Sequence, residues 1–344
     1  MIILGIETSC DETSASLVED GKKIVSLYTF SQAEIHKDFD GVVPEVASRN
    51  HLARITEVLE GALKGFDIDG VDVFAATSGP GLIGSLLVGT NTAKSLSLFF
   101  NKPYVPVNHI LAHMYTPHIE NEIPFPYIGL VASGGHTILF LVRSYYDIEF
   151  LGSTIDDAIG EAFDKIAKYF KLGYPGGPVI DKLSQKATSF KIKEFEDIPL
   201  PLPEKKDRYN FSYSGLKTAI IYRAKKTKID ETDIPYVVKR FQDVAIKHLL
   251  DKTLNAVNDT GIKRVVISGG VSGNSFLRKQ LEMLKEERRI DFYTASLKLC
   301  SDNAAMVAGR AYVDYINKPD SFDSSTLRSV VFSRLDFIKK GKRR

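Results

Sequence analysis

The chain has little cysteine and no long hydrophobic run, and both absences limit what it can be. Its 344 residues include only two cysteines, Cys10 and Cys300, with no CxxC spacing. This usage argues against a disulfide framework and favours a reducing compartment. No apolar run approaches the ~20 residues that span a bilayer, and Glu7 interrupts the first apolar run, which predicts a strand rather than a signal peptide. We therefore expect a cytoplasmic protein with no membrane association.

Two common nucleotide-binding sequences are also missing. The chain contains no G-x-x-x-x-G-K-[ST] sequence, which excludes a P-loop, and no GxGxxG that would support a dinucleotide site. Hydrophobic residues make up 44% of the chain and charged residues 26%, with a net charge of +2, which fits a globular protein of two domains. Lysine and arginine cluster at 191–208, 225–228 and 339–344, where they could bind phosphate or simply be solvated.

A strand-turn-strand-turn-strand pattern occurs twice, at about residues 2–28 and 127–151. Alternating helices and strands follow each copy. This repetition predicts an α/β protein built from two similar halves. Further strands are expected at 71–77, 104–107, 264–268 and 291–293, and helices at 44–63, 82–100, from 109, at 157–170, after Pro178, after Gly273 and at 302–315.

Three of the expected strands end in glycine-rich turns, Ser78–Gly81, Ser133–Gly135 and Ser268–Gly270. Glycine allows backbone N–H groups to approach and hold phosphate oxygens. The turn Thr8–Thr13 adds hydroxyl groups and acids, and two such turns facing each other would hold a polyphosphate or an adenylate. Each turn alone is a common strand ending, but together they indicate a nucleotide.

The segment Gly173–Pro178 is a second unusual feature, since it holds three glycines and two prolines in six residues. It is either a rigid turn between helices or a loop whose backbone contacts a ribose or base. Asp164, on the polar face of the preceding helix, either accepts ribose hydroxyls or is solvated.

His109 and His113 stand four residues apart in an expected helix, so they share one face with their Cβ atoms roughly 6 Å apart. Two imidazoles in this arrangement can chelate a divalent metal. Asp302 begins the last expected helix as either its cap or a third ligand, and two histidines with one carboxylate leave coordination positions open for substrate. His118 and His136 are alternative ligands.

Eight segments of the chain resemble, in order, one protein family. It is the bacterial-type tRNA N(6)-adenosine threonylcarbamoyltransferase (TsaD) family, formerly described as glycoproteases or O-sialoglycoprotein endopeptidases, and the resemblance covers about residues 1–310. The segments are Ile6–Thr13 (IETSCDET), Gly41–Glu45 (GVVPE), His109–His113, Ser133–Thr137 (SGGHT), Gly160–Lys165 (GEAFDK), Tyr174–Pro178 (YPGGP), Phe211–Lys217 (FSYSGLK) and Asp302–Asn303.

The resemblance implies an actin/Hsp70/sugar-kinase-like fold, with two RNase-H-like halves around a nucleotide cleft. The first half would hold residues 1–108 with a returning C-terminal helix in 303–344, and the second 109–302 with a helical insertion at about 155–260. The implied activity moves a threonylcarbamoyl group from threonylcarbamoyl-AMP to the exocyclic amine of the adenosine 3′ of the anticodon, in tRNAs reading codons that begin with A.

The resemblance also assigns residues and partners. Its metal, expected to be Fe²⁺ although Zn²⁺ or Mn²⁺ accept the same ligands, maps onto His109, His113 and Asp302. Gly273 stands where the family more often has alanine, and a smaller residue still admits the adenine. The implied partners are tRNA, a catalytically degenerate paralogue of the same fold and a small P-loop ATPase. The implied adenylate contacts are Val131, Ala132, Ser133, Gly134, Gly135, Asp164, Gly177, Asp181 and Asn274.

The expected reaction needs no protein nucleophile. The metal would polarise and orient the carbamoyl carbonyl, and the glycine turns would stabilise the departing AMP. Because an adenosine amine is a poor nucleophile, a base is expected, and Asp11 and Glu12 in the first turn are the candidates.

Three other functions remain open from the residues alone. An ATPase or sugar kinase of the same fold class would use the glycine turns but would have no role for the histidine pair. A metalloprotease is disfavoured because the pair lacks the glutamate of His-Glu-x-x-His that serves as general base. A non-catalytic scaffold would be indicated by lost ligands, but every ligand type is present.

Overall fold

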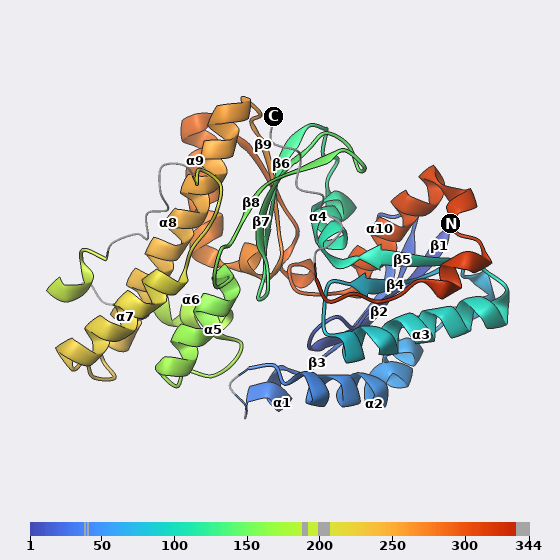
Figure 1. Ribbon diagram of the computed structural model, residues 1–344, viewed down its shortest axis with the longest axis horizontal. Coiled ribbons are helices and arrows are strands. Elements are labelled where there is room, and N and C mark those ends of the chain that lie inside the picture. The colour runs from blue at the N-terminus through green and yellow to red at the C-terminus, as the bar shows by residue number, and fades with distance from the viewer. Residues whose placement is uncertain (38, 40, 188–191, 199–206, 335–344) are drawn as a thin grey trace. The chain divides into compact units, whose positions relative to one another are not determined.

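The computed structural model describes residues 1–37, 39, 41–187, 192–198 and 207–334, which form two compact units (Figure 1). The first unit contains Met1–Glu122 together with the described residues from Ala295 onward, and the second contains Ile123–Thr294. The sequence predicts boundaries at 108/109 and 302/303 instead. Helix α4 (His109–Glu120) belongs to the first unit because it packs along α10 (Ala304–Asn317).

The first unit is built on a mixed five-stranded sheet of order β3-β2-β1-β4-β5. Strands β1, β2 and β3 form an antiparallel meander, and β4 and β5 run parallel to β1. The carboxyl ends of β1, β4 and β5 therefore lie at one edge of the sheet. The strands are β1 (Ile2–Glu7), β2 (Glu12–Glu19), β3 (Lys23–Ser31), β4 (Val73–Gly79) and β5 (Tyr104–Asn108).

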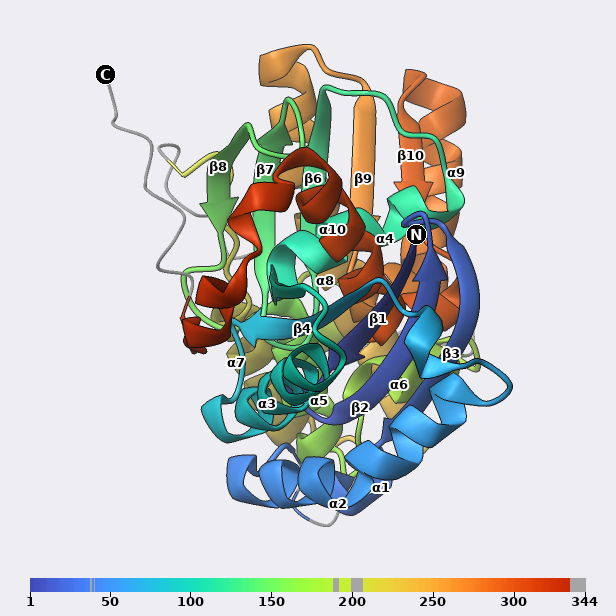
Figure 2. The same cartoon turned by 90° about the vertical axis from the view of Figure 1, so that its right-hand side faces the viewer.

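Helices cover both faces of this sheet (Figure 2). Alternate residues of β1 contact the helices on opposite faces of the sheet, as strand geometry requires. Leu4 and Ile6 pack among buried residues of α2 (Pro44–Leu63) and α3 (Ile83–Phe100). Gly5, between them, meets α10 so closely that a Cβ would lie 2.5 Å from the Ala304 carbonyl oxygen. A short helix, α1 (Ala33–Lys37), precedes α2.

The second unit repeats the sheet of the first. Its order, β8-β7-β6-β9-β10, matches β3-β2-β1-β4-β5 strand for strand, including the antiparallel meander and the two parallel strands. This confirms the expected actin-like α/β fold of two related halves. The strands are β6 (Tyr127–Ala132), β7 (Thr137–Val142), β8 (Ile148–Ser153), β9 (Arg264–Ser268) and β10 (Asp291–Thr294).

The expected insertion at about 155–260 is helical in the described residues. Aromatic side chains hold its helices together, since Phe163 packs edge-on against Phe241 at 5.0 Å between ring centroids. The helices of this unit are α5 (Ile159–Tyr169), α6 (Gly176–Ser184), α7 (Ser214–Thr227), α8 (Ile234–Thr260) and α9 (Ser275–Arg288).

The last helix, expected at 302–315, is confirmed as α10 (Ala304–Asn317). The described chain beyond it does not continue this helix through 303–344 but forms short 3-10 turns, Pro319–Ser321 and Ser324–Arg328. The basic residues at 335–344, and those at 191, 205 and 206, lie outside the described residues. Among the residues that the structure describes, no helix is both long enough and apolar enough to cross a bilayer.

Candidate metal centre and adenylate-binding turns

Helix α4 presents two histidines at its first turn. Asn108 caps the helix, because its side-chain oxygen accepts hydrogen bonds from the N–H groups of Ile110 and Leu111 at 3.0 and 3.1 Å. The cap fixes the start of the helix at His109. His113 lies one turn later, with the two ring centroids 4.5 Å apart, so the pair occupies one face as the sequence predicts.

Asp302 reaches this pair from the other end of the chain. Glu120, the last residue of α4, accepts hydrogen bonds from the backbone N–H and the hydroxyl of Ser296 at 2.6 and 2.7 Å. These bonds anchor the segment that leads to Asp302. Asn303, rather than Asp302, caps α10 by accepting a hydrogen bond from the N–H of Met306, so the carboxylate of Asp302 is left to face the histidines.

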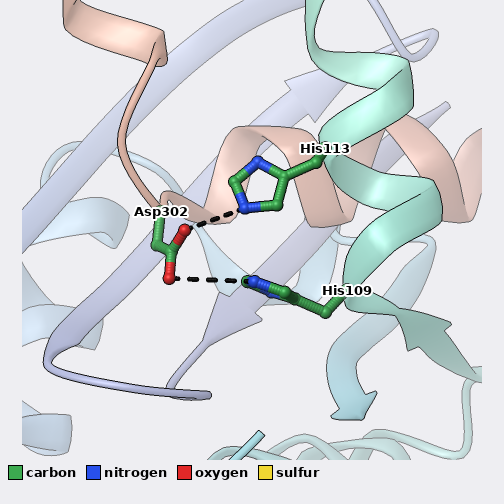
Figure 3. Close-up of side chains that lie close together, drawn as sticks. All are labelled: His109, His113 and Asp302. Atoms are coloured by element: carbon green, nitrogen blue, oxygen red, sulfur yellow. Dashed lines mark ion pairs between the residues drawn. The ribbon is translucent and has the colours of Figure 1, made fainter. Parts of the chain in front are cut away.

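The three side chains converge as one divalent cation would require (Figure 3). Nε2 of His113 lies 3.0 Å from one Asp302 oxygen, and Nε2 of His109 lies 3.8 Å from the other. Two ligand atoms that each lie about 2.0–2.2 Å from one ion are at most roughly 4.4 Å apart, so both separations allow a shared ion. Among the described residues this is the one cluster of its kind, and neither His118 nor His136 joins it.

Hydrogen bonding supports a metal at this position. Both ring nitrogens of His113 are buried and make no hydrogen bond with the described residues, despite the short distance from Nε2 to Asp302. A buried polar atom without a partner is costly, so such an atom calls for an explanation. A metal on Nε2 provides one. The Asp302 side chain keeps 18% of its surface exposed, against 5% and 1% for the histidines, so the cluster is open on its carboxylate side.

The charged groups around the cluster shift one another's pKa. Burial by itself lowers the pKa of His109, but the carboxylates of Asp302 and Glu7 outweigh it and raise the pKa to about 9. Burial raises the pKa of Glu7, but the charge and hydrogen bond of His109, together with the hydrogen bond from Thr77, outweigh burial and lower the pKa. Two carboxylates, Glu7 and Asp302, therefore flank His109, which is an environment that favours positive charge.

The candidate bases Asp11 and Glu12 lie in the same unit. Burial, together with the charges of Asp11 and Asp302, raises the pKa of the Glu12 carboxyl well above its ordinary value. The Asp11 side chain is buried, and its carbonyl oxygen accepts a hydrogen bond from Gln32. The structure thus brings a carboxyl of raised pKa into the electrostatic neighbourhood of Asp302.

In the second unit, the turns after β6 and β9 lie at one edge of the sheet because these strands are parallel neighbours. Glycine packs the turns together. A Cβ on Gly269 would lie 2.4 Å from the Ala132 carbonyl oxygen, and one on Gly160 would lie 2.6 Å from that of Ser133. Gly269 also has a φ of +88°, which glycine adopts without strain. These glycines are required by packing.

Other glycines of the same region face open space. A Cβ on Gly134, Gly135, Gly177 or Gly270 would meet no atom within 4 Å. Nothing in the packing requires glycine at these four positions, but the absence of a side chain leaves the backbone N–H groups accessible. This is the arrangement that a phosphate or ribose can approach.

Three of the polar residues expected to contact an adenylate, Asp164, Asp181 and Asn274, have side chains that make hydrogen bonds within the second unit. Asp164 accepts one from the N–H of Gly176 at 2.7 Å, and Asp181 accepts two from the N–H and hydroxyl of Ser275. Asn274 caps α9 and donates to Gln242 at 2.8 Å. Val131 and Ala132 are buried in β6, and Ser133 is buried in the turn. These bonds fix the turns and helix starts that carry the open glycines.

Sequence reasoning missed Glu7. It ends β1 and is 1% exposed, with hydrogen bonds to Ser9, Thr77 and His109. The one available signal was an acid that ends an otherwise apolar strand. That signal gives no partner, because two of the three contacts are 70 and 102 residues away.

Structural comparison defines the class of protein first. Component A of (R)-2-hydroxyglutaryl-CoA dehydratase from Acidaminococcus fermentans matches 92% of this chain and 99% of its own, with a TM-score of 0.54 and 16% identity. HypF from T. kodakarensis matches 95% of this chain and 49% of its own, with a TM-score of 0.59 and 14% identity. At these identities the matches show the fold alone, which is of the actin/Hsp70/sugar-kinase type.

Sequence comparison then shows the family. The model of the TsaD family, tRNA N6-adenosine threonylcarbamoyltransferase, matches residues 23–309. Proteins of that name from Brachyspira hyodysenteriae and Treponema denticola are 49% and 48% identical, over 91% and 99% of this chain and 91% and 100% of their own length. The chain belongs to this family of tRNA-modifying transferases.

Proposed function

We propose that this chain transfers the threonylcarbamoyl group of threonylcarbamoyl-AMP to the exocyclic amine of the adenosine 3′ of the anticodon, in tRNAs reading codons that begin with A. The observation that carries the proposal is the cluster of His109, His113 and Asp302 in a member of this family. An ATPase or sugar kinase of the same fold would have no use for two buried imidazoles aimed at one carboxylate.

Nε2 of His109, Nε2 of His113 and the carboxylate of Asp302 would hold the cation. Such an ion acts as a Lewis acid that polarises and orients a carbonyl. We assign Fe²⁺ to the site as the family expectation, while the same ligands accept Zn²⁺ or Mn²⁺. Three protein ligands would leave the remaining positions for substrate, and the partial exposure of Asp302 supports an opening on its side.

The second unit would bind the adenylate. The open glycines Gly134, Gly135, Gly177 and Gly270 offer backbone N–H groups to a phosphate and ribose without a side chain in the way. The contacts of Asp164, Asp181 and Asn274 hold the surrounding turns in place. N–H groups that are already positioned would also stabilise the negative charge that AMP carries away.

The transfer forms one bond and breaks another. The adenosine amine attacks the carbamoyl carbon, the bond from that carbon to the phosphate oxygen breaks, and the amine must lose one proton. Glu12 suits the role of acceptor, because its raised pKa makes its carboxylate a stronger base than an ordinary glutamate. Asp11 contributes to that shift through its charge, which makes it the electrostatic partner of Glu12.

Helix α7 offers a surface for the tRNA phosphates. Residues 208–229 contain no acid, and Lys225, Lys226 and Lys228 are exposed. Lys225 lies over the ring of Tyr169 at 6.0 Å, which brings the end of α5 alongside α7. Exposed Tyr222 adds a ring on which a base could stack. A basic, acid-free helix with an exposed aromatic fits a nucleic-acid backbone.

We assign the same cellular setting that the family resemblance implies. The chain would work in the cytoplasm with a catalytically degenerate paralogue of the same fold and a small P-loop ATPase. The cysteine usage is consistent with a reducing compartment.

The test is a transfer assay on the full chain, purified anaerobically and analysed for metal content. Unmodified tRNA, labelled threonylcarbamoyl-AMP and the two partner proteins are supplied, and label in tRNA is measured. We expect label in tRNAs reading A-starting codons and AMP released in equal amount. Absence of label under these conditions, with the metal present, would overturn the proposal. Label transferred by a His109→Ala, His113→Ala double variant would remove the metal centre from it.

A further inference from the structure

We propose that Glu7 is a positioning residue that holds His109 in the tautomer and orientation needed to bind a cation through Nε2. The inference rests on the metal centre of the proposed function and concerns how this chain builds it. Glu7 is not one of the three converging ligands, and its role follows from hydrogen bonds on the opposite side of the His109 ring.

Three parallel strands bring Glu7, Thr77 and His109 close together. Glu7 is the last residue of β1, Thr77 lies in β4, and His109 follows β5 directly. Strands β1 and β4 are parallel, with Ile6 opposite Ala76, so Glu7 comes opposite Thr77. Because β5 is parallel to β4 as well, the carboxyl ends of all three strands bring these side chains together beneath the start of α4.

The carboxylate of Glu7 has both oxygens engaged. The backbone N–H of Ser9 donates to Oε1 at 2.6 Å, and the hydroxyl of Thr77 donates to Oε2 at 2.5 Å. Oε2 also lies 3.3 Å from Nδ1 of His109. The two strong donors fix the plane of the carboxylate, so that Oε2 points toward the imidazole.

This contact determines which nitrogen carries the proton. An ionised carboxylate can only accept hydrogen bonds, so Nδ1 of His109 must be the N–H that donates to it. In the neutral imidazole, which is the form that binds a cation, Nε2 then carries the lone pair, 3.8 Å from Oδ2 of Asp302. Metal-binding histidines commonly donate their second N–H to a carboxylate in this way, which orients the ring and makes it a better ligand.

Two comparisons show that Glu7, rather than a neighbouring group, orients His109 and that His113 is not oriented in the same way. The hydroxyl of Ser9 also lies 3.3 Å from Nδ1 of His109, but a neutral hydroxyl makes a weaker bond than a carboxylate. His113 has no such support, since its Nδ1 makes no hydrogen bond with the described residues. Glu7 therefore orients His109, whereas no carboxylate orients the His113 ring through Nδ1 in this way.

The experiment measures metal affinity in the full chain, without tRNA or adenylate, by competition for Zn²⁺ against a chromogenic chelator. Glu7→Gln is expected to weaken Zn²⁺ binding about 10- to 100-fold, the usual effect of losing such a partner. Ser9→Ala is expected to stay within about threefold of the wild type. Glu19→Gln, which removes an exposed carboxylate from β2 of the same unit, is the matched control and should leave the affinity unchanged.

A second variant covers the case in which Glu7→Gln does not fold. Thr77→Val removes the donor that orients Oε2 but keeps the carboxylate, and we expect it to weaken Zn²⁺ binding by about three- to tenfold. NMR of the imidazole N–H groups adds a direct readout. The Nδ1–H of His109 should resist solvent exchange in the Zn²⁺-loaded wild type and exchange rapidly in Glu7→Gln.

The outcomes separate this inference from the proposed function. A folded Glu7→Gln or Thr77→Val protein with wild-type Zn²⁺ affinity would show that Glu7 is only structural and would overturn the inference. A wild type that binds no divalent ion would instead overturn the metal centre itself. Loss of transfer activity in a variant of unchanged affinity would also count against positioning.

Discussion

A glycine within the Ser133–Gly135 turn and a glycine packed against it should respond to alanine in opposite ways. Gly135 faces open space, whereas a Cβ on Gly160 would lie 2.6 Å from the carbonyl oxygen of Ser133 and 2.8 Å from Cα of Gly134. Both residues have ordinary backbone angles, so alanine is not excluded by conformation at either position. If the Ser133–Gly135 turn binds the adenylate phosphate, Gly135→Ala should impair binding, and Gly160→Ala should impair folding.

The magnitudes follow from these contacts. At Gly135, alanine reduces the entropy of the unfolded chain and should be neutral or stabilising by about 0.4–1 kcal/mol. At Gly160, backbone must move to admit the methyl group, which costs about 1–3 kcal/mol. For a unit of this size, each kcal/mol shifts Tm by roughly 2–4 °C, so Gly160→Ala should lower Tm by roughly 2–12 °C.

The assay combines thermal unfolding with calorimetric titration of AMP and a non-hydrolysable threonylcarbamoyl-AMP analogue. Gly135→Ala should bind both at least about tenfold more weakly, a loss of about 1.4 kcal/mol, with Tm unchanged or higher. Wild-type affinity in Gly135→Ala would refute the assignment of this turn to the phosphate. A large fall in its Tm would refute the claim that the glycine is dispensable for folding.

Three further predictions use other parts of the molecule. Asp302→Ala should lower the divalent-metal content of the anaerobically purified chain by at least tenfold with a near-normal Tm, and full metal occupancy would contradict the centre. Burial lowers the pKa of His118 and of His248 to about 4, so the unfolded chain binds more protons between pH 4 and about 6.5. The contribution of these two histidines to stability should therefore be complete above pH 6.5 and fall by up to ~3 kcal/mol per histidine toward pH 4. His248→Gln should flatten this acidic limb in pH-dependent chemical unfolding. Lys225→Glu with Lys226→Glu should weaken binding of all tRNAs similarly and reduce the slope of log K against log salt by about two, and an unchanged slope would place the tRNA elsewhere.

The sequence pattern predicts an element correctly where the bounds of that element depend only on its own residues. The strands at Tyr127–Ala132 and Arg264–Ser268 begin and end where the sequence predicts, because each is a short apolar run that stops at a serine-glycine turn. The duplicated meander was visible for the same reason. The extents of α7 and α8 were not predicted, since their buried faces are defined by packing against each other and against α5 and α6.

The residues of the candidate site likewise divide into those that the sequence predicts and those that depend on tertiary packing. His109 and His113 could be paired from sequence because helical spacing alone places them on one face. Asp302 could be either a cap or a ligand, and the choice depended on Asn303, which caps α10 and leaves Asp302 to the histidines. Glu7 could not be assigned at all, because its burial and its partners arise only when β1, β4 and β5 pair.

The repeated topology explains how one scaffold could serve two kinds of ligand. In the first unit, β1 ends in Glu7 and β5 leads into His109, so side-chain groups with lone pairs gather at the carboxyl edge of the sheet. In the second unit, β6 and β9, the counterparts of β1 and β4, lead into Gly134 and Gly270, which leave backbone N–H groups uncovered. A cation needs lone-pair donors, and an anion needs N–H donors. The same sheet edge therefore suits a metal where side chains fill it and a phosphate where glycine leaves it bare.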